Sequence, residues 1–227
     1  TLQILVRPYG SGKRLVLSSD ITESERADSM RRDFVANVSH EIRTPLTVLA
    51  GFVESLGALS LTAGEQRRVL SLMEQQTARM QALVADLLTL AQLEGSPRPA
   101  PDVWTPVRRL VEQTKADALA LSAGRHEIVF ALDLAGELAG TASELQSALG
   151  NLVSNAVRYT PQGGRIELKW VRRADGSGVF EVLDNGPGIA REHLPRITER
   201  FYRVDGSRSR ETGGTGLGLS IVKHVMQ

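Results

Sequence analysis

Residues 34–46 read FVANVSHEIRTPL, and this stretch decides the fold of the first part of the chain. Apolar residues recur every three or four positions from Val35 to Leu56, which is the spacing of one face of an α-helix. His40 lies roughly 160° from the centre of that stripe, so its imidazole is expected to face solvent. Pro45 falls inside the same pattern and removes one backbone hydrogen bond, so it is expected to bend the helix beside the histidine.

A second helical stripe runs from Val69 to Leu90, after a break at residues 61–64. Two helices with such narrow apolar stripes cannot bury enough surface alone. The pattern therefore predicts a helical hairpin that dimerises into a symmetric four-helix bundle.

The remaining segments define the expected domain boundaries. Residues 1–22 hold two short strand patterns around a glycine turn, and an isolated hairpin is marginal in water, so they are expected to belong to a larger domain. Residues 23–95 form the helical domain, and 96–101 a linker rich in proline. Residues 102–227 read as mixed α/β, with helices near 103–122 and 142–158, strands near 126–132, 165–171 and 179–183, and a last helix from about 216.

Composition excludes several functional classes. The 27 basic and 26 acidic side chains nearly cancel, which gives no global field directed at nucleic acid or acidic lipid. The chain has no cysteine, so disulfides and thiolate metal sites are excluded. No apolar run approaches the roughly 18 residues of a membrane-spanning helix.

Three stretches carry the polar groups that chemistry needs. Residues 151–160 read NLVSNAVRYT and place Asn151, Asn155 and Arg158 on one helix face, where neutral oxygens and a cation suit Mg²⁺ with ATP phosphates. Asp184 ends a strand and opens the run DNGPGI, where it could accept a hydrogen bond from an adenine amino group. Residues 213–220 read GGTGLGLS and precede a helix, whose first N–H groups suit phosphate. Each pattern alone also fits a solvated surface or an ordinary turn.

In this order, and over residues 34–224, the stretches resemble the motifs of sensor histidine kinases. Residues 34–46 resemble the phosphoacceptor box, which implies that ATP phosphorylates His40 and that the phosphoryl group then passes to an aspartate of a response regulator. Glu41 supplies the carboxylate that a nucleophilic imidazole needs. The resemblance associates Thr44 with phosphatase activity on that regulator. The run ERFYRVD at 199–205 resembles the phenylalanine box, which makes Arg203 the lid arginine.

The same resemblance implies ATP and Mg²⁺ as cofactors. Asn155 would be the Mg²⁺ ligand, Asn151 and Arg158 would contact the phosphates, Tyr159 would help to enclose the nucleotide, and Asp184 would read adenine. The two glycine boxes would add the nucleotide contacts Gly186, Gly188, Gly214, Thr215, Gly216, Leu217 and Gly218.

The implied fold is the four-helix bundle followed by an α/β-sandwich ATP-binding domain of the GHKL type, normally completed by two strands after the last helix of this sequence. The implied partners are a second copy of the chain and a receiver domain, with no direct nucleic-acid contact. Residues 1–22 would end a PAS-like sensing domain, and the chain would be the cytoplasmic portion of an inner-membrane sensor. The wording of residues 194–203 and 207–214 looks most like phosphate-regulon sensor kinases of the PhoR type, although Thr198 stands where most relatives have phenylalanine.

Two other readings stay open at this point. One is a GHKL ATPase of the gyrase, mismatch-repair or chaperone type, which carries a glutamate four residues before the Mg²⁺ asparagine, where this chain has Asn151. The other is a degenerate kinase that serves as a dimeric scaffold, and the intact His40, Asn155 and Asp184 argue against it.

Overall fold

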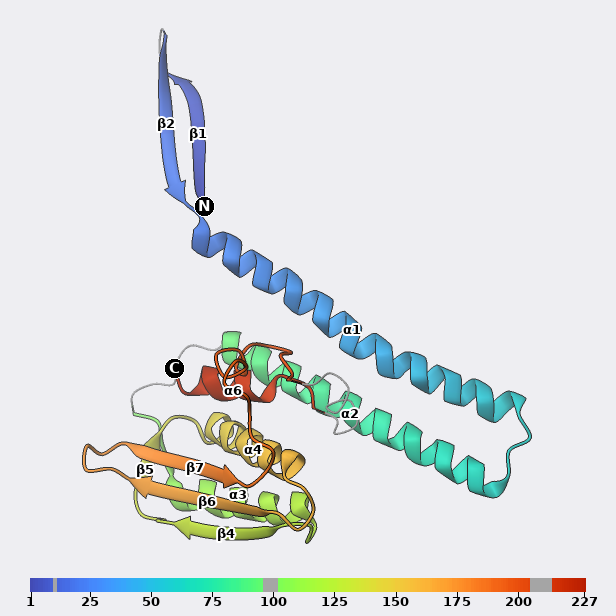
Figure 1. The fold of residues 1–227 in the computed structure, drawn as a ribbon. Coiled ribbons are helices and arrows are strands. Elements are labelled where there is room, and N and C mark those ends of the chain that lie inside the picture. The colour runs from blue at the N-terminus through green and yellow to red at the C-terminus, as the bar shows by residue number, and fades with distance from the viewer. Residues whose placement is uncertain (10–11, 96–101, 205–213) are drawn as a thin grey trace. The chain divides into compact units, whose positions relative to one another are not determined.

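A computed structural model describes residues 1–9, 12–95, 102–204 and 214–227 (Figure 1). The chain forms two compact units, Thr1–Met73 and Glu74–Gln227. The expected linker at 96–101, the centre of the glycine turn and most of residues 207–214 lie outside the described residues. No helix within the described ranges combines the length and the apolar character that a bilayer crossing requires.

The first unit begins with a two-stranded antiparallel ribbon. Strands β1 (Leu2–Tyr9) and β2 (Lys13–Asp20) pair in register from Leu2 opposite Asp20, so both are longer than the sequence predicts. Apolar side chains remain exposed on both strands, with Ile4 at 63% and Val16 at 60%. The ribbon therefore has no core of its own in this chain.

Two long helices follow the ribbon. Helix α1 (Thr22–Ala58) runs through Pro45 without interruption, and the Pro45 side chain is buried. Helix α2 (Ala63–Gly95) begins with a capping box: the Thr62 N–H and hydroxyl donate to the Glu65 carboxylate at 2.8 and 2.7 Å, and the Glu65 N–H returns a bond to the Thr62 hydroxyl at 3.3 Å. These hydrogen bonds lower the pKa of Glu65. This capping box explains why α2 begins directly after the break that the sequence predicts at residues 61–64.

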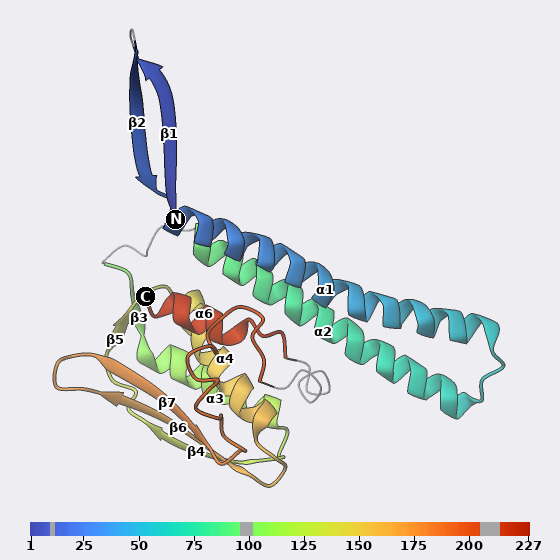
Figure 2. The same ribbon diagram turned by 45° about the horizontal axis from the view of Figure 1, so that its top comes forward.

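The second unit is a sheet covered by helices on one face (Figures 1 and 2). Strand β6 (Arg165–Arg172) lies in the centre, parallel to β4 (Glu127–Leu132) and antiparallel to β7 (Gly178–Asp184). Helices α3 (Val107–Ser122) and α4 (Ala142–Tyr159) lie on the sheet, and α6 (Gly218–Val225) packs on α4. Along β6, Ile166, Leu168 and Trp170 are buried, whereas Glu167 and Lys169 between them form an ion pair at 3.4 Å. This alternation is what a half-buried strand requires.

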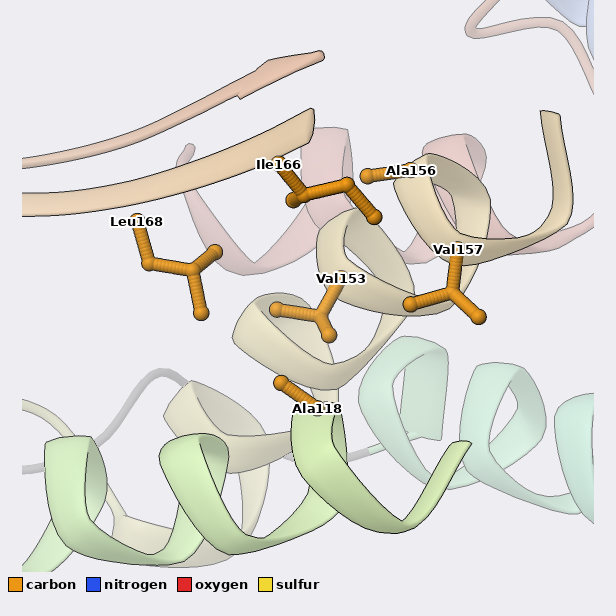
Figure 3. Packing of buried hydrophobic residues seen from close by; sticks show 6 residues of the cluster. All are labelled: Ala118, Val153, Ala156, Val157, Ile166 and Leu168. Carbon is orange, nitrogen blue, oxygen red and sulfur yellow. The ribbon is translucent and has the colours of Figure 1, made fainter. Parts of the chain in front are cut away.

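The core of this unit lies between α3, α4 and β6 (Figure 3). Val153 of α4 and Ile166 of β6 are fully buried, and Leu168 and Ala118 are 1% exposed. This packing fixes which face of α4 turns toward the sheet.

The sequence prediction fails at the start of α3. Residues Trp104–Pro106 form strand β3, which pairs antiparallel with β5 (Glu137–Ala139), and the helix begins only at Val107. Proline suits the position just before a helix because its fixed φ matches the helix entry. Strands of three residues show no readable periodicity, so neither was predicted.

Replacement of Leu168 by alanine tests the core. We expect Leu168→Ala to lower the free energy of unfolding by about 2–5 kcal/mol, because the side chain is buried and leaves a cavity. Leu183→Ala on the neighbouring strand is the matched control, since Leu183 is 46% exposed and should cost about 0.5 kcal/mol or less. Urea unfolding followed by circular dichroism gives both values. Equal losses would show that the core lies elsewhere.

Candidate functional site

The expected acceptor turn lies on α1, in the first unit. His40 is exposed, and the Thr44 hydroxyl one turn later donates a hydrogen bond to the His40 carbonyl oxygen at 3.1 Å. Glu41 is partly buried beside them. An exposed imidazole with a carboxylate next to it and a hydroxyl on the same helix face is a plausible nucleophile with its supporting groups.

The polar residues of α4 lie in the second unit, on the helix whose apolar side forms the core. Asn151 donates from Nδ2 to the Ser147 carbonyl oxygen at 2.9 Å, which fixes its amide. The backbone of Gly218 then approaches the Asn151 oxygen so closely that a Cβ at Gly218 would lie 2.4 Å from Oδ1. The start of α6 is therefore packed directly on the polar face of α4.

Asn155 is half-buried one turn after Asn151, and its side chain makes no hydrogen bond to any of the described residues. An amide oxygen is a neutral, hard ligand of the kind Mg²⁺ accepts, and Mg²⁺ in nucleotide sites commonly takes only one or two protein ligands plus phosphate oxygens and water. Among the described residues no group of three histidine or acidic side chains could hold a metal by itself. The residues fit a metal that arrives with its phosphates.

The end of α4 meets the second glycine box. A Cβ at Gly214 would lie 3.2 Å from the Arg158 Nη1 and 3.6 Å from the Tyr159 hydroxyl oxygen. The Arg158 side chain therefore lies directly against the backbone at Gly214, while Tyr159 stays 45% exposed at the rim. A guanidinium beside a glycine backbone is a suitable anion site.

The loop after β7 reaches the same helix end. The Gly186 N–H donates to the Asp184 carboxylate at 2.9 Å, and a Cβ at Gly186 would lie 3.0 Å from the Tyr159 carbonyl oxygen. Gly188 has a φ of +71°, a conformation that favours glycine. Asn185 accepts a bond from the Arg165 N–H at 2.8 Å and ties the loop to β6. Asp184 itself stays exposed at the strand end.

The segment 199–203 packs on the second glycine box through backbone atoms. The Phe201 N–H donates to the Gly216 carbonyl oxygen at 2.8 Å, and a Cβ at Gly216 would lie 2.8 Å from the Phe201 Cα. Phe201 has a φ of 62°, which is strained for a bulky residue. Arg203 follows two residues later and is half-buried.

A side-chain cluster holds this segment in place. The Tyr202 hydroxyl lies 2.8 Å from the His193 Nδ1, and the Arg196 guanidinium covers the Tyr202 ring at 4.3 Å from its centroid. Arg196 also pairs with Glu199 at 3.1 Å. These contacts position the residue that precedes Arg203.

The sequence analysis missed Asp86 of α2, which contacts this site. The buried Thr215 hydroxyl donates to the Asp86 carboxylate of α2 at 2.6 Å and accepts the Leu217 N–H at 3.2 Å. Burial raises the pKa of the Asp86 carboxyl, against the opposing effects of the Thr215 hydrogen bond and the Arg158 charge. A single aspartate on a helix carries no signal that a distant threonine partly buries it, so the sequence could not indicate the contact.

The structure thus gathers the nucleotide-site candidates of α4, of the loop after β7 and of the second glycine box around one end of α4. His40, Glu41 and Thr44 lie in the other unit.

Comparison with known proteins gives the family. A model of the His Kinase A (phospho-acceptor) domain matches residues 30–96, and a model of the histidine kinase-, DNA gyrase B- and HSP90-like ATPase matches residues 140–227. The chain belongs to the histidine kinase family. It is 48% identical over 227 residues to the phosphate regulon sensor protein PhoR of Pseudomonas aeruginosa, an alignment that covers 99% of the chain and 51% of the relative. The expected resemblance to phosphate-regulon sensor kinases is confirmed, and the chain spans about half the length of such relatives.

Solved structures of histidine kinases agree with the fold. The Acinetobacter baumannii histidine kinase AdeS is 24% identical with a TM-score of 0.58, over 82% of this chain and 85% of that one. Full-length ShkA in complex with AMPPNP is 30% identical with a TM-score of 0.55, over 85% of this chain and 40% of that one. The expected order, a helical hairpin region and then a GHKL ATP-binding domain, is confirmed.

A methyl group at Gly218 tests the contact between α6 and α4. We expect Gly218→Ala to weaken binding of an ATP analogue about tenfold or more, because the new Cβ would displace the Asn151 amide. Gly150→Ala is the control: it lies next to Asn151, its Cβ would meet no atom within 4 Å, and alanine suits a helix better than glycine. Calorimetric titration measures both affinities. Unchanged binding in Gly218→Ala would contradict the arrangement.

Proposed function

We propose that this chain is the kinase portion of a two-component sensor, which transfers the γ-phosphoryl group of ATP to His40 and then to an aspartate of a response regulator. The observation that carries the proposal is the convergence of three motif segments on the polar face of α4, in a chain that also presents an exposed histidine beside a glutamate. The first arrangement suits a nucleotide, and the second suits a phosphoryl acceptor.

The reaction needs a nucleophile, a base and stabilisation of charge. An unprotonated ring nitrogen of His40 attacks the γ-phosphorus, the N–P bond forms, and the bond to the bridging oxygen breaks so that ADP leaves with the electron pair. The proton on the other ring nitrogen is held by or passed to Glu41. Arg158 and Arg203 offset the negative charge on the phosphoryl oxygens.

The ATP-binding residues have separate roles in this proposal. Asn155 would hold Mg²⁺, which supplies charge neutralisation of the triphosphate when bound. Asn151 orients the phosphates, Tyr159 covers the nucleotide, and Asp184 accepts a hydrogen bond from the adenine amino group. The backbone at Gly214, Gly216 and Gly218 approaches closely because these positions carry no side chain.

We propose the domain boundaries that the sequence predicts: a sensing-domain remnant at 1–22, a dimerisation and phosphotransfer domain at 23–95, a linker at 96–101 and a catalytic domain at 102–227. We place the chain on the cytoplasmic side of a membrane sensor, with a receiver domain as its partner. The similarity to PhoR supports a role in the response to phosphate starvation.

Replacement of the acceptor separates phosphorylation from nucleotide binding. We expect His40→Gln to abolish acid-labile labelling from γ-labelled ATP while the affinity for ATP stays unchanged, because the two functions lie in different units. Labelling followed by acid treatment identifies phosphohistidine, and calorimetry on the same protein measures ATP binding. Acid-labile label on His40→Gln would refute the acceptor assignment, and ATP turnover without label in the wild type would favour a GHKL ATPase.

The apolar stripe of α1 supports a homodimer. Val35, Leu46 and Val53 remain 57%, 49% and 58% exposed in the single chain, which is surface that a second copy would cover. We expect the chain to sediment as a dimer at micromolar concentration and Leu46→Ala with Val53→Ala to shift it toward monomer. Ala58→Ser, at an exposed position on the opposite side of the same helix, should leave the dimer intact. A folded wild-type monomer would contradict the proposal.

The two residues beside His40 should act in opposite directions. We expect Thr44→Ala to retain self-phosphorylation and transfer but to lose dephosphorylation of the regulator, because the hydroxyl that could orient water is gone. Glu41→Gln should slow self-phosphorylation instead. Both activities are measured with the purified regulator, and Thr47→Ala is the control because its hydroxyl likewise bonds the helix backbone, at 3.0 Å, one turn from the site. Wild-type dephosphorylation by Thr44→Ala would refute its role.

A further inference from the structure

Asp86 is an acidic residue of α2 that lies among the groups assigned to phosphate binding. Its carboxylate accepts the Thr215 hydroxyl at 2.6 Å, a short bond of the charge-assisted kind. Thr215 belongs to the second glycine box and is itself buried. The charge of Arg158 also acts on Asp86. Two of the groups expected to receive ATP phosphates therefore already face an anion from the same chain.

A carboxylate and a phosphate compete for such groups because both are anionic oxygen acceptors. Arg158 lies against the Gly214 backbone, so its guanidinium is held close to the glycine box. The Leu217 N–H, at the start of α6, donates to the Thr215 hydroxyl at 3.2 Å. With Asp86 in place, the Thr215 hydroxyl and the Leu217 N–H are both hydrogen-bonded within the chain.

The C-terminal half of α2 makes two further contacts, both with residues of the proposed catalytic domain (102–227). The His224 Nε2 of α6 lies 3.1 Å from the Leu93 carbonyl oxygen, and the Glu94 carboxylate forms an ion pair with Arg200. Arg200 precedes Phe201, whose N–H bonds to Gly216. The contacts of α2 therefore reach both α6 and the segment that carries Arg203.

We propose that Asp86 is an internal competitor of the nucleotide phosphates: it binds the Thr215 hydroxyl, and ATP must displace it. This inference rests on the proposed nucleotide site. Partial burial disfavours the charged carboxylate of Asp86, which lowers the free-energy cost of moving it away from Thr215. Binding of ATP and binding of Asp86 to the glycine box oppose each other, and such coupling is reciprocal. ATP that displaces Asp86 therefore also loosens α2 from the glycine box. In this way nucleotide binding would be coupled to the position of the acceptor domain.

The test compares Mg-ATP with adenosine, which carries no phosphate. The whole chain is titrated by calorimetry in the wild type, Asp86→Ala and Asp86→Asn, with circular dichroism to confirm that each variant is folded. We expect both variants to bind Mg-ATP at least about fivefold more tightly than the wild type, the lower end of typical coupling, with no change for adenosine. Glu94→Gln is the matched control, since it removes an acidic group of the same helix that pairs with Arg200, and it should bind Mg-ATP as the wild type does.

Three results would overturn the inference. Unchanged or weaker Mg-ATP binding in both Asp86 variants would show that the carboxylate does not compete. Equal tightening for adenosine, or the same tightening in Glu94→Gln, would show that a general loosening of α2 is responsible. Phosphohistidine labelling of the same preparations separates this inference from the proposed function. If the proteins are labelled but their affinities for Mg-ATP are equal, only the role of Asp86 is refuted. If the Asp86 variants bind Mg-ATP more tightly but neither they nor the wild type are labelled, only the kinase proposal is refuted.

Discussion

The arrangement of the candidate nucleotide site depends on the packing of α4 against β6 and α3. Val153 and Ile166 are fully buried in it, and Ala156 and Val157 extend the same face. Burial of this kind fixes the rotation of a helix about its own axis, because a turned helix would expose apolar surface and bury amides. Once the apolar face is fixed, Asn151 and Asn155 can point only toward the side where the glycine-rich loops arrive.

Close backbone approach then assembles the site from segments far apart in the chain. A Cβ at Gly218 would overlap the Asn151 amide, and a Cβ at Gly186 or Gly214 would crowd the Tyr159 carbonyl or the Arg158 guanidinium. A loop that must lie this close to a helix requires glycine for space as much as for conformation. The strained φ of Phe201 belongs to the same assembly, since its backbone is pressed against Gly216. Strain of this kind persists only where the surrounding contacts hold it.

Electrostatics links the helical region to the ATP site. Asp86 on α2 contacts Thr215, a group that a nucleotide triphosphate would influence through its charge, whereas Glu94 pairs with Arg200, to which no nucleotide contact is assigned. A helix that supplies anions to a phosphate site can be released by the ligand itself, without a separate mechanical signal. In a kinase whose acceptor histidine lies on a different unit from its nucleotide site, such release offers a physical link between binding and transfer.

The sequence by itself indicated the family, the candidate acceptor His40, the long helices and central strands, and the candidate site residues of α4. These features are local: periodicity is set by contacts three or four residues apart, and a motif is a fixed run of residues. The tertiary structure alone decided the short strands β3 and β5, the start of α3 and the partial burial of Asp86. The Asp86–Thr215 contact joins residues 129 positions apart. Nothing in the local pattern around either residue distinguishes such a pair from a solvated aspartate and a turn threonine, because long-range contacts arise only when separate elements pack against each other.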